Sequence, residues 1–338
     1  MIHCRITCIP EPRTLALAAL IFLAWCGAAT ADTPALHWPL ECEIGKTCFI
    51  QAYVDRDPGA GVADFMCGAL TRDGHTGTDI AVIDAAAMQR GTKVLAAAAG
   101  TVTGMRDGVA DRSVEEIGKD AVTAVECGNG VVINHGDGWE TQYCHLRRGS
   151  VRVRSKDRVA AGDAIGLVGL SGLTNYPHVH LAVRRFGKTI DPFDGENSDH
   201  PCGKAKSSLW QDTPAYVPTG LIDAGFAGRQ PDQLAAESGA LNQNPIPRNA
   251  EAMVFWVRLF GVEAQDRLHL RLLGPDGRTM VEVLGDPINR HKERYFQFAG
   301  RKRVGPTWVA GVYRGEFRLL RGADETVVVS ATREVQVR

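Results

Sequence analysis

The sequence predicts a mainly β protein, in which an antiparallel β-sheet domain is followed by a C-terminal immunoglobulin-like β-sandwich. Short runs of β-forming residues alternate with glycine-containing turns, and helical periodicity is nearly absent between residues 64 and 192. The length of 338 residues also exceeds what one hydrophobic core usually organises. We expect a signal peptide at 1–31, a lead-in at 32–63, a first domain at 64–204, a linker at 205–248 and a sandwich at 249–338.

The first thirty-one residues are typical of an export signal. Two arginines precede an apolar run at 15–25, and Ala29-Thr30-Ala31 supplies small residues for cleavage. A lipoprotein signal ending at Cys26 is the alternative, and the bulky Trp25 directly before it argues against lipidation. No other stretch reaches the roughly 18 apolar residues that a membrane span requires. We therefore expect an exported protein, periplasmic or extracellular, without a membrane span.

Cysteines support an oxidising compartment. Three of the nine lie within the leader, which leaves an even six for the exported chain. Such a set favours disulfides, with six unpaired buried thiols as the alternative. The expected pairs are Cys42–Cys48 across a small loop, Cys127–Cys144 across a predicted hairpin and, by elimination, Cys67–Cys202.

The composition excludes several classes of protein. Apolar residues make up 44% of the chain and charged residues 23%, values that argue against a disordered or fibrous role. A net charge of −1 offers no broad basic surface for nucleic acid. The glycine-rich segment 166–172 lacks the Lys-Ser/Thr ending of a phosphate-binding loop, so we interpret it as a loop that shapes a groove wall.

The first domain is expected to contain six strands, at 78–83, 94–102, 131–134, 140–145, 165–168 and 178–184. Asp137-Gly138 between the third and fourth runs predicts a hairpin, because this pair supplies the positive φ of a tight turn. One helical turn is expected around 85–89. Residues 105–126 are expected to form a long surface loop, either functional or merely inserted. The lead-in is expected to pack against this domain.

The C-terminal region returns to alternating apolar and polar residues after a linker with one short helix near 231–238. Its predicted strands are 254–259, 268–273, 279–284, 294–298, 311–320 and 325–337. Six strands with turns about every ten residues predict the sandwich. His269 and His291 are isolated there, so we expect surface or packing roles for them.

Three histidine-bearing segments suggest a metal site; they are 74–79, 143–146 and 177–181. His178 and His180 are two residues apart, so on a strand both imidazoles project from one face. His75 and Asp79 would lie about 13 Å apart in an extended strand, too far to share an ion. The backbone must therefore fold between them, which Gly77 permits. We expect His75 on a loop and Asp79 at the start of a strand.

Together these segments resemble the LytM/lysostaphin family of zinc endopeptidases. The family pattern is a His-x-x-x-Asp, an intervening His after a β-hairpin and a later His-x-His. It is met by His75 and Asp79, by His145, and by His178 and His180. Connecting segments also fit, at 100–102, 128–133, 135–139, 162–166 and 191–193. The resemblance spans roughly residues 64–194 and leaves the C-terminal region outside.

This resemblance implies that His75, Asp79 and His180 hold Zn²⁺, and that His145 and His178 are the catalytic pair. Zinc accepts imidazole nitrogens and carboxylate oxygens, and catalytic sites keep one position open. One histidine of the pair would act as general base while the other stabilises the oxyanion, and either assignment remains open.

The resemblance further implies an endopeptidase that hydrolyses peptide cross-links of bacterial peptidoglycan, with an extended peptide lying in an open groove of the β domain. Two alternatives are a non-catalytic cell-wall-binding activator of other hydrolases and an endopeptidase acting on extracellular proteins. We expect the C-terminal sandwich to position the enzyme or to bind a protein or wall partner. Whether the lead-in blocks the groove stays open.

Overall fold

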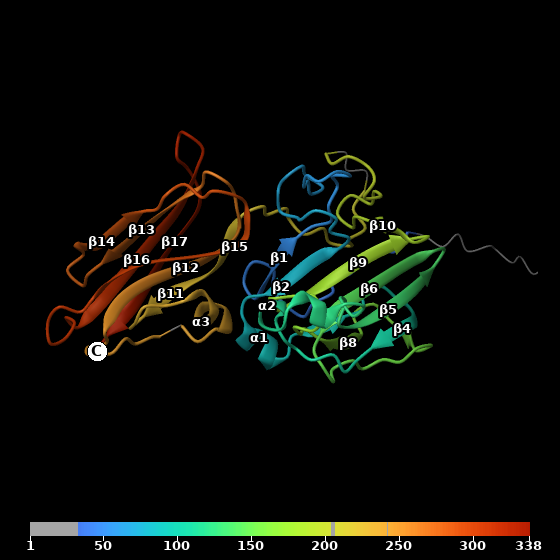
Figure 1. Ribbon diagram of the computed structural model, residues 1–338, viewed down its shortest axis with the longest axis horizontal. Helices are drawn as coiled ribbons and strands as arrows, with labels where there is room; N and C mark the ends of the chain where they lie inside the picture. The colour runs from blue at the N-terminus through green and yellow to red at the C-terminus, as the bar shows by residue number, and fades with distance from the viewer. Residues whose placement is uncertain (1–32, 204–206, 242) are drawn as a thin grey trace, which may run out of the picture. The chain divides into compact units, whose positions relative to one another are not determined.

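The computed structural model describes residues 33–203, 207–241 and 243–338 (Figure 1). Residues Thr33–Arg338 form one compact unit. The predicted signal peptide lies outside the described residues. The mainly β prediction is confirmed, because strands account for nearly all of the regular structure in the part of the chain that is described. We call the elements β1 to β10 the N-terminal lobe and β11 to β17 the C-terminal lobe.

The N-terminal lobe is built on an eight-stranded antiparallel sheet in the order β1-β2-β9-β6-β5-β4-β7, with β10 paired to β9. Its strands are β1 (Cys48–Ala52), β2 (Thr78–Val82), β4 (Gly100–Arg106), β5 (Asn129–Gly136), β6 (Trp139–Leu146), β7 (Arg158–Val159), β9 (His178–Arg185) and β10 (Lys188–Ile190). A separate pair is formed by β3 (Lys93–Leu95) and β8 (Ala164–Leu167).

The run 94–102, expected to be one strand, is two strands in different sheets. Between them the backbone N–H of Ala96 donates to the carbonyl of Asp163 at 2.9 Å, and that of Ala97 donates to the hydroxyl of Tyr143 at 2.7 Å. Because these donors are committed to other partners, the segment leaves one sheet and enters the next.

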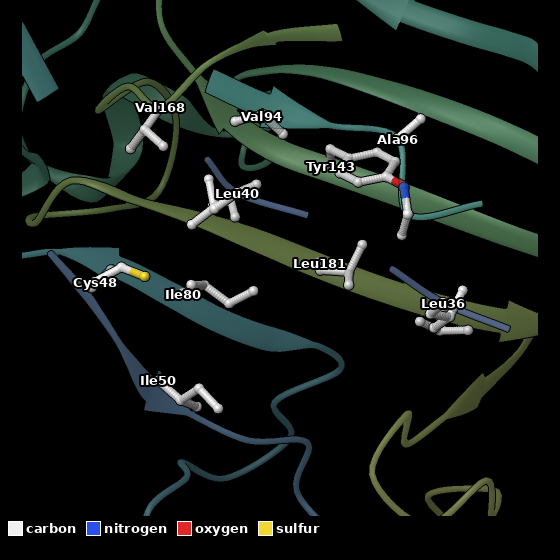
Figure 2. Close-up of a cluster of buried hydrophobic side chains, with 14 of the residues drawn as sticks. Leu36, Leu40, Cys48, Ile50, Ile80, Val94, Ala96, Tyr143, Val168 and Leu181 are labelled. Carbon is white, nitrogen blue, oxygen red and sulfur yellow. The ribbon is translucent and has the colours of Figure 1, made fainter. Parts of the chain in front are cut away.

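The lead-in packs against the sheet and contributes a strand that was not predicted. β1 pairs with β2 in antiparallel register, with Ile50 opposite Ile80. Leu36 and Leu40 enter the same buried cluster as Ile80 and Leu181 (Figure 2). The lead-in therefore completes the core beneath the strands that carry the histidines.

Short helices connect some of the strands. α1 (Ala85–Arg90) begins after Asp84, whose carboxylate accepts from the N–H of Ala87, and ends at Gly91 with φ 94°. The segment 105–126 contains α2 (Val114–Ile117) and the 3₁₀ helix η1 (Lys119–Val122). It is fastened to neighbouring loops, because Asp107 accepts from the N–H of Gly149 at 2.7 Å and Asp111 accepts from that of Leu170 at 2.8 Å.

All three expected disulfides are present: Cys42–Cys48, Cys67–Cys202 and Cys127–Cys144. The last one links the residue before His145 to the segment that precedes β5. It therefore fastens the end of β6 next to a predicted site residue.

The C-terminal lobe consists of two antiparallel sheets, consistent with the predicted sandwich, in the orders β11-β12-β15 and β14-β13-β16-β17. The strands are β11 (Gly220–Ala227), β12 (Ala252–Val262), β13 (Arg267–Leu273), β14 (Thr279–Leu284), β15 (Lys292–Lys302), β16 (Gly311–Arg321) and β17 (Thr326–Val337). Phe255, Leu270 and Phe317 share its buried core.

Part of the expected linker is instead a strand of this lobe. β11 pairs with β12, and Ala224 and Phe226 are buried in the lobe core. The two glycines within Gly220–Ala227 weaken its strand pattern, so its burial was not visible from the sequence. The short helix expected near 231–238 is α3 (Gln233–Ser238).

Candidate metal centre

Neighbouring strands bring the predicted ligands together. Asp79 on β2 and His180 on β9 are cross-strand partners, so their side chains share one face of the sheet. His75 lies on the loop before β2, and Asp79 is the second residue of that strand, as expected from their spacing. The sheet register therefore supplies the convergence that the motif alone could only suggest.

Three ligand atoms form a compact triangle. His75 Nε2 lies 3.1 Å from Asp79 Oδ1 and 3.1 Å from His180 Nδ1, and the last two atoms are 2.8 Å apart. Ligands of a tetrahedral zinc ion at about 2.0–2.1 Å lie about 3.3 Å from one another. The triangle is therefore close to the size that one small cation would require.

The tautomers of three imidazoles are set by backbone carbonyls. Nδ1 of His75 donates to Tyr53 at 2.6 Å, Nδ1 of His145 to Ser171 at 2.8 Å, and Nδ1 of His178 to Tyr176 at 2.8 Å. A carbonyl only accepts, so each Nδ1 carries a proton and each ring faces the site through Nε2. His180 faces the cluster through Nδ1 instead.

His145 and His178 stand beside the triangle, with ring centroids 4.6 Å apart. His178 Nε2 lies 3.5 Å from Asp79 Oδ1, and within the described part of the chain it is buried with no hydrogen-bond partner. An orphaned buried nitrogen is costly unless a ligand or solvent satisfies it. His145 adopts φ 63°, a left-handed conformation that is uncommon for a non-glycine residue.

Electrostatics favour a cation at this place. Burial alone would raise the pKa of Asp79, but the charges of His75, His178 and Arg72 hold it well below its usual value. Burial also lowers the pKa of His180 and lowers that of His145 well below its ordinary value, with neighbouring imidazoles adding to the effect. An ionised carboxylate therefore lies beside His145 and His180, whose protonation is disfavoured, and carboxylate and neutral imidazole are the donors that zinc uses.

Gly77 is needed for a reason different from the expected one. It is not among the glycines with positive φ, so backbone freedom is not its role. A Cβ at this position would lie 2.6 Å from Cε1 and Nε2 of His180 and 2.7 Å from the carbonyl oxygen of Leu181. The absent side chain therefore makes room for a ligand imidazole.

Arg72 is a functional residue that the sequence reasoning missed. Its Nη2 donates to Asp79 Oδ2 at 2.7 Å, so the oxygen that does not face the triangle is held by a charge-assisted hydrogen bond. An arginine in a loop rich in Asp and Gly usually points to solvent, so only its closeness to His75 in the sequence could have drawn notice.

A groove of about 300 Å³ opens beside these side chains. Its lining includes His145 and His180, the Cys127–Cys144 disulfide, and three charged side chains; these are Arg72, Glu126 and Arg184. The arrangement can hold a metal ion, receive an extended chain and offer two further imidazoles for proton transfer.

Comparison with known proteins agrees with this reading. Residues 73–192 match the family model described as peptidase family M23. All five predicted site residues lie within the matched segment.

Curated relatives match over part of the chain. The DD-carboxypeptidase/endopeptidase Mpg of Neisseria meningitidis is 35% identical over 120 residues, which cover 35% of this chain and 22% of the relative. The peptidoglycan DD-endopeptidase ShyA of Vibrio cholerae is 36% identical over 64 residues, covering 19% of this chain and 14% of that protein. The cell division protein DipM of Caulobacter vibrioides is 40% identical over 57 residues, covering 17% and 9%. The chain thus spans about a fifth or less of these relatives.

Solved structures resemble the chain only at low overall similarity. The catalytic domain of the prophage-encoded M23 protein EnpA from Enterococcus faecalis is 24% identical, with a TM-score of 0.32 over 48% of this chain and 96% of that one. The lysostaphin catalytic domain from Staphylococcus simulans is 21% identical, with a TM-score of 0.27 over 42% and 85%. Scores at this level support no transfer of individual residues.

Proposed function

We propose that the chain is a zinc-dependent endopeptidase that cuts peptide cross-links of bacterial peptidoglycan, a proposal that starts from the match of residues 73–192 to the model of peptidase family M23. One observation carries the proposal. His75 Nε2, Asp79 Oδ1 and His180 Nδ1 converge within 3.1 Å of one another, beside two further imidazoles. Such clustering of buried polar groups is expensive without a bound cation.

In this proposal zinc would supply a Lewis acid that polarises the scissile carbonyl and lowers the pKa of water toward about 7. The protein's own residues do the rest. His75 and His180 hold the ion as neutral ligands, and Arg72 keeps Asp79 ionised and oriented.

Proton transfer is assigned to His145 and His178. The lowered pKa of His145 keeps its Nε2 free to accept a proton from the attacking water, and that proton can pass to the leaving amine. The second role, stabilisation of the developing oxyanion, is assigned to His178, whose Nε2 lies 3.5 Å from Asp79 Oδ1. The sequence leaves this choice open, and the assignment is part of the proposal.

The proposed substrate is supported by the relatives rather than by the groove. Two of the matched proteins are named as DD-endopeptidases or carboxypeptidases, one of them explicitly for peptidoglycan. A cell-wall substrate requires export, so a periplasmic or extracellular location belongs to the same proposal. No described helix is long and apolar enough to cross a membrane.

The two rival functions differ from the proposal in measurable ways. A non-catalytic wall-binding activator needs none of the five side chains, yet all five are present and clustered. An endopeptidase that acts on extracellular proteins would use the same chemistry on a different substrate. Only a comparison of the substrates that are cleaved can distinguish it from the proposal.

The test is mass spectrometry of fragments released from purified sacculi by the zinc-loaded protein. We expect cleaved peptide cross-links with the wild type and none with His180→Ala. His269→Ala is the matched control, because its imidazole pairs with Glu282 on the surface of the C-terminal lobe. Release of equal fragments by His180→Ala, or cleavage of a protein substrate with intact sacculi, would reject the proposal.

A further inference from the structure

Tyr176 occupies a controlling position next to the site. Its carbonyl accepts the Nδ1 proton of His178 at 2.8 Å and a second bond from the hydroxyl of Thr174 at 2.9 Å. The residue is 1% exposed. Because this carbonyl orients the His178 ring, any group that holds Tyr176 in place also holds His178 Nε2 in the site.

Two arginines of the C-terminal lobe contact the Tyr176 side chain, in addition to its contacts within the N-terminal lobe. Arg258 on β12 is 3% exposed; its Nη1 donates to the Tyr176 hydroxyl at 3.2 Å and its Nη2 to the carbonyl of Ile83 at 2.6 Å. The hydroxyl itself donates to the same Ile83 carbonyl at 2.5 Å. Arg258 and Tyr176 therefore share one acceptor, the carbonyl of Ile83, which directly follows β2.

A second arginine of the same lobe covers the other side of the tyrosine. The guanidinium of Arg294 on β15 lies 4.2 Å from the centroid of the Tyr176 ring, a cation–π contact. Its Nη2 donates to Asn175 Oδ1 at 3.2 Å, and its Nη1 pairs with Glu237 at 3.0 Å. Two cations from neighbouring strands thus enclose the residues that lead into His178.

The same lobe also reaches the ligand side of the site. Glu293, beside Arg294, lies 3.7 Å from Arg72, the residue that binds Asp79 Oδ2. Glu293 also accepts from the amide of Gln51 on β1 at 3.3 Å. These contacts are partly exposed and hence weaker than those of Arg258. Through Arg72 they also reach the candidate metal ligand Asp79.

Burying a charge between two lobes costs desolvation free energy, and apolar side chains of similar size often stabilise such an interface equally well. Arg258 directs both terminal nitrogens at neutral acceptors of the N-terminal lobe, and within the described residues its Nε has no hydrogen-bond partner. An aromatic contact, Phe49 stacked on Phe260 at 5.0 Å, already supplies apolar adhesion. The arginine therefore fits a positioning role better than simple adhesion.

We propose that Arg258 and Arg294 are positioning residues for His178, which act through Tyr176 and make the C-terminal lobe a working part of the metal centre. The proposal rests on the proposed function only where it names His178 as catalytic. It gives the C-terminal lobe a role inside the site, in addition to any partner that the lobe binds.

The test compares Arg258→Met, which keeps the bulk of the side chain, with Arg271→Gln, which removes an ion pair to Glu316 within the C-terminal lobe. We expect Arg258→Met to lower kcat about tenfold, with KM and zinc affinity within about twofold of wild type, because second contacts to an imidazole are typically worth 10–100-fold. Arg271→Gln should match wild type in all three.

A readout independent of turnover is the ¹⁵N-histidine NMR signal of the His178 Nδ1 proton, assigned by its loss in His178→Gln. This signal should be sharp in the zinc-loaded wild type and broadened by exchange in Arg258→Met. If the wild type fails to digest sacculi, the proposed function fails while this signal still tests the positioning role.

Tyr176→Phe removes the same contact from the side of the N-terminal lobe. It keeps the test valid if Arg258→Met does not fold. It removes the hydroxyl but keeps the ring and the carbonyl, so kcat and the Nδ1 signal should change in the same direction, by about threefold or more if each lost bond is worth the usual amount. Folded Arg258→Met and Tyr176→Phe proteins with wild-type kcat and an unchanged His178 signal would overturn the proposal.

Discussion

The two lobes are both built from antiparallel sheets, but they use histidine in opposite ways. In the N-terminal lobe four imidazoles gather at one place, and three of them are anchored through Nδ1 on backbone carbonyls. In the C-terminal lobe His269 pairs with Glu282 on the neighbouring strand at 2.8 Å, and His291 has no hydrogen bond to either ring nitrogen among the described residues. The difference teaches that histidines on strands do not suffice for a site. The imidazoles must also be oriented, here by hydrogen bonds from Nδ1 to backbone carbonyls.

Removal of a metal ligand should have the largest effect on the histidine cluster of the N-terminal lobe. Asp79→Asn removes the only carboxylate of the triangle. We expect zinc affinity to fall by more than the about 100-fold typical of outer contacts, and hydrolysis to fall to background. Glu282→Gln, which disturbs a histidine–carboxylate pair of the C-terminal lobe, should leave both unchanged. Zinc titration against a competing chelator measures the difference, and equal affinities for the two variants would contradict the account.

The catalytic pair should separate from the ligands in a second experiment. His145→Ala should retain zinc, because His145 is outside the ligand triangle, but kcat should fall by about 10²–10⁴-fold with the loss of a general base. Metal analysis and turnover must be measured on the same preparation. Loss of zinc in this variant would place His145 among the ligands and would require a different mechanism.

Metal removal should destabilise the two lobes unequally. At a free zinc concentration about 1,000 times its Kd, binding contributes about 4 kcal/mol to the stability of the lobe that binds it. Chelation should therefore speed hydrogen exchange mainly in β2 and β9 and leave β13 and β16 largely protected. Exchange followed by mass spectrometry reports this; equal loss of protection in both lobes would show that they unfold as one cooperative unit.

A smaller effect should appear in the pH dependence of stability. Burial, together with Asp194 and Asp64, raises the pKa of Asp191 from 3.8 to about 7, although Arg56 opposes the shift. The folded state then keeps a proton that the unfolded state has lost, so stability falls as pH rises from about 4 to about 7. Asp191→Asn removes this dependence.

Urea unfolding at pH 5 and pH 8 measures the prediction. The free energy of unfolding of Asp191→Asn, relative to that of the wild type, should rise by on the order of 3 kcal/mol from pH 5 to pH 8, since each pKa unit corresponds to about 1.4 kcal/mol. A constant difference between the two proteins across the same range would show that Asp191 is ionised throughout.

The sequence predicted the parts of the site that depend on local spacing. His178 and His180 lie on one strand face, and the fold between His75 and Asp79 follows from the length of an extended chain. The disulfides followed from loop closure and elimination. Arg72 was missed because its role depends on which side chain it meets, and nothing in the motif specifies that partner.

Features that depend on packing between distant segments were beyond the sequence. Tyr176 meets Arg258 across 82 positions, and no periodicity encodes that encounter. The break between β3 and β4 arises from hydrogen bonds to Asp163 and Tyr143, which a local pattern of β-forming residues does not reveal. β11 was read as a linker because glycine and alanine weaken its alternation, although most of its residues are buried.

Anomalous diffraction at the zinc edge from crystals of the zinc-loaded protein tests the central claim most directly. The account predicts one strong peak at about 2.0–2.2 Å from His75 Nε2, Asp79 Oδ1 and His180 Nδ1, with His145 and His178 outside the bonded set. A peak bonded to other side chains, or none in an active preparation, would contradict it.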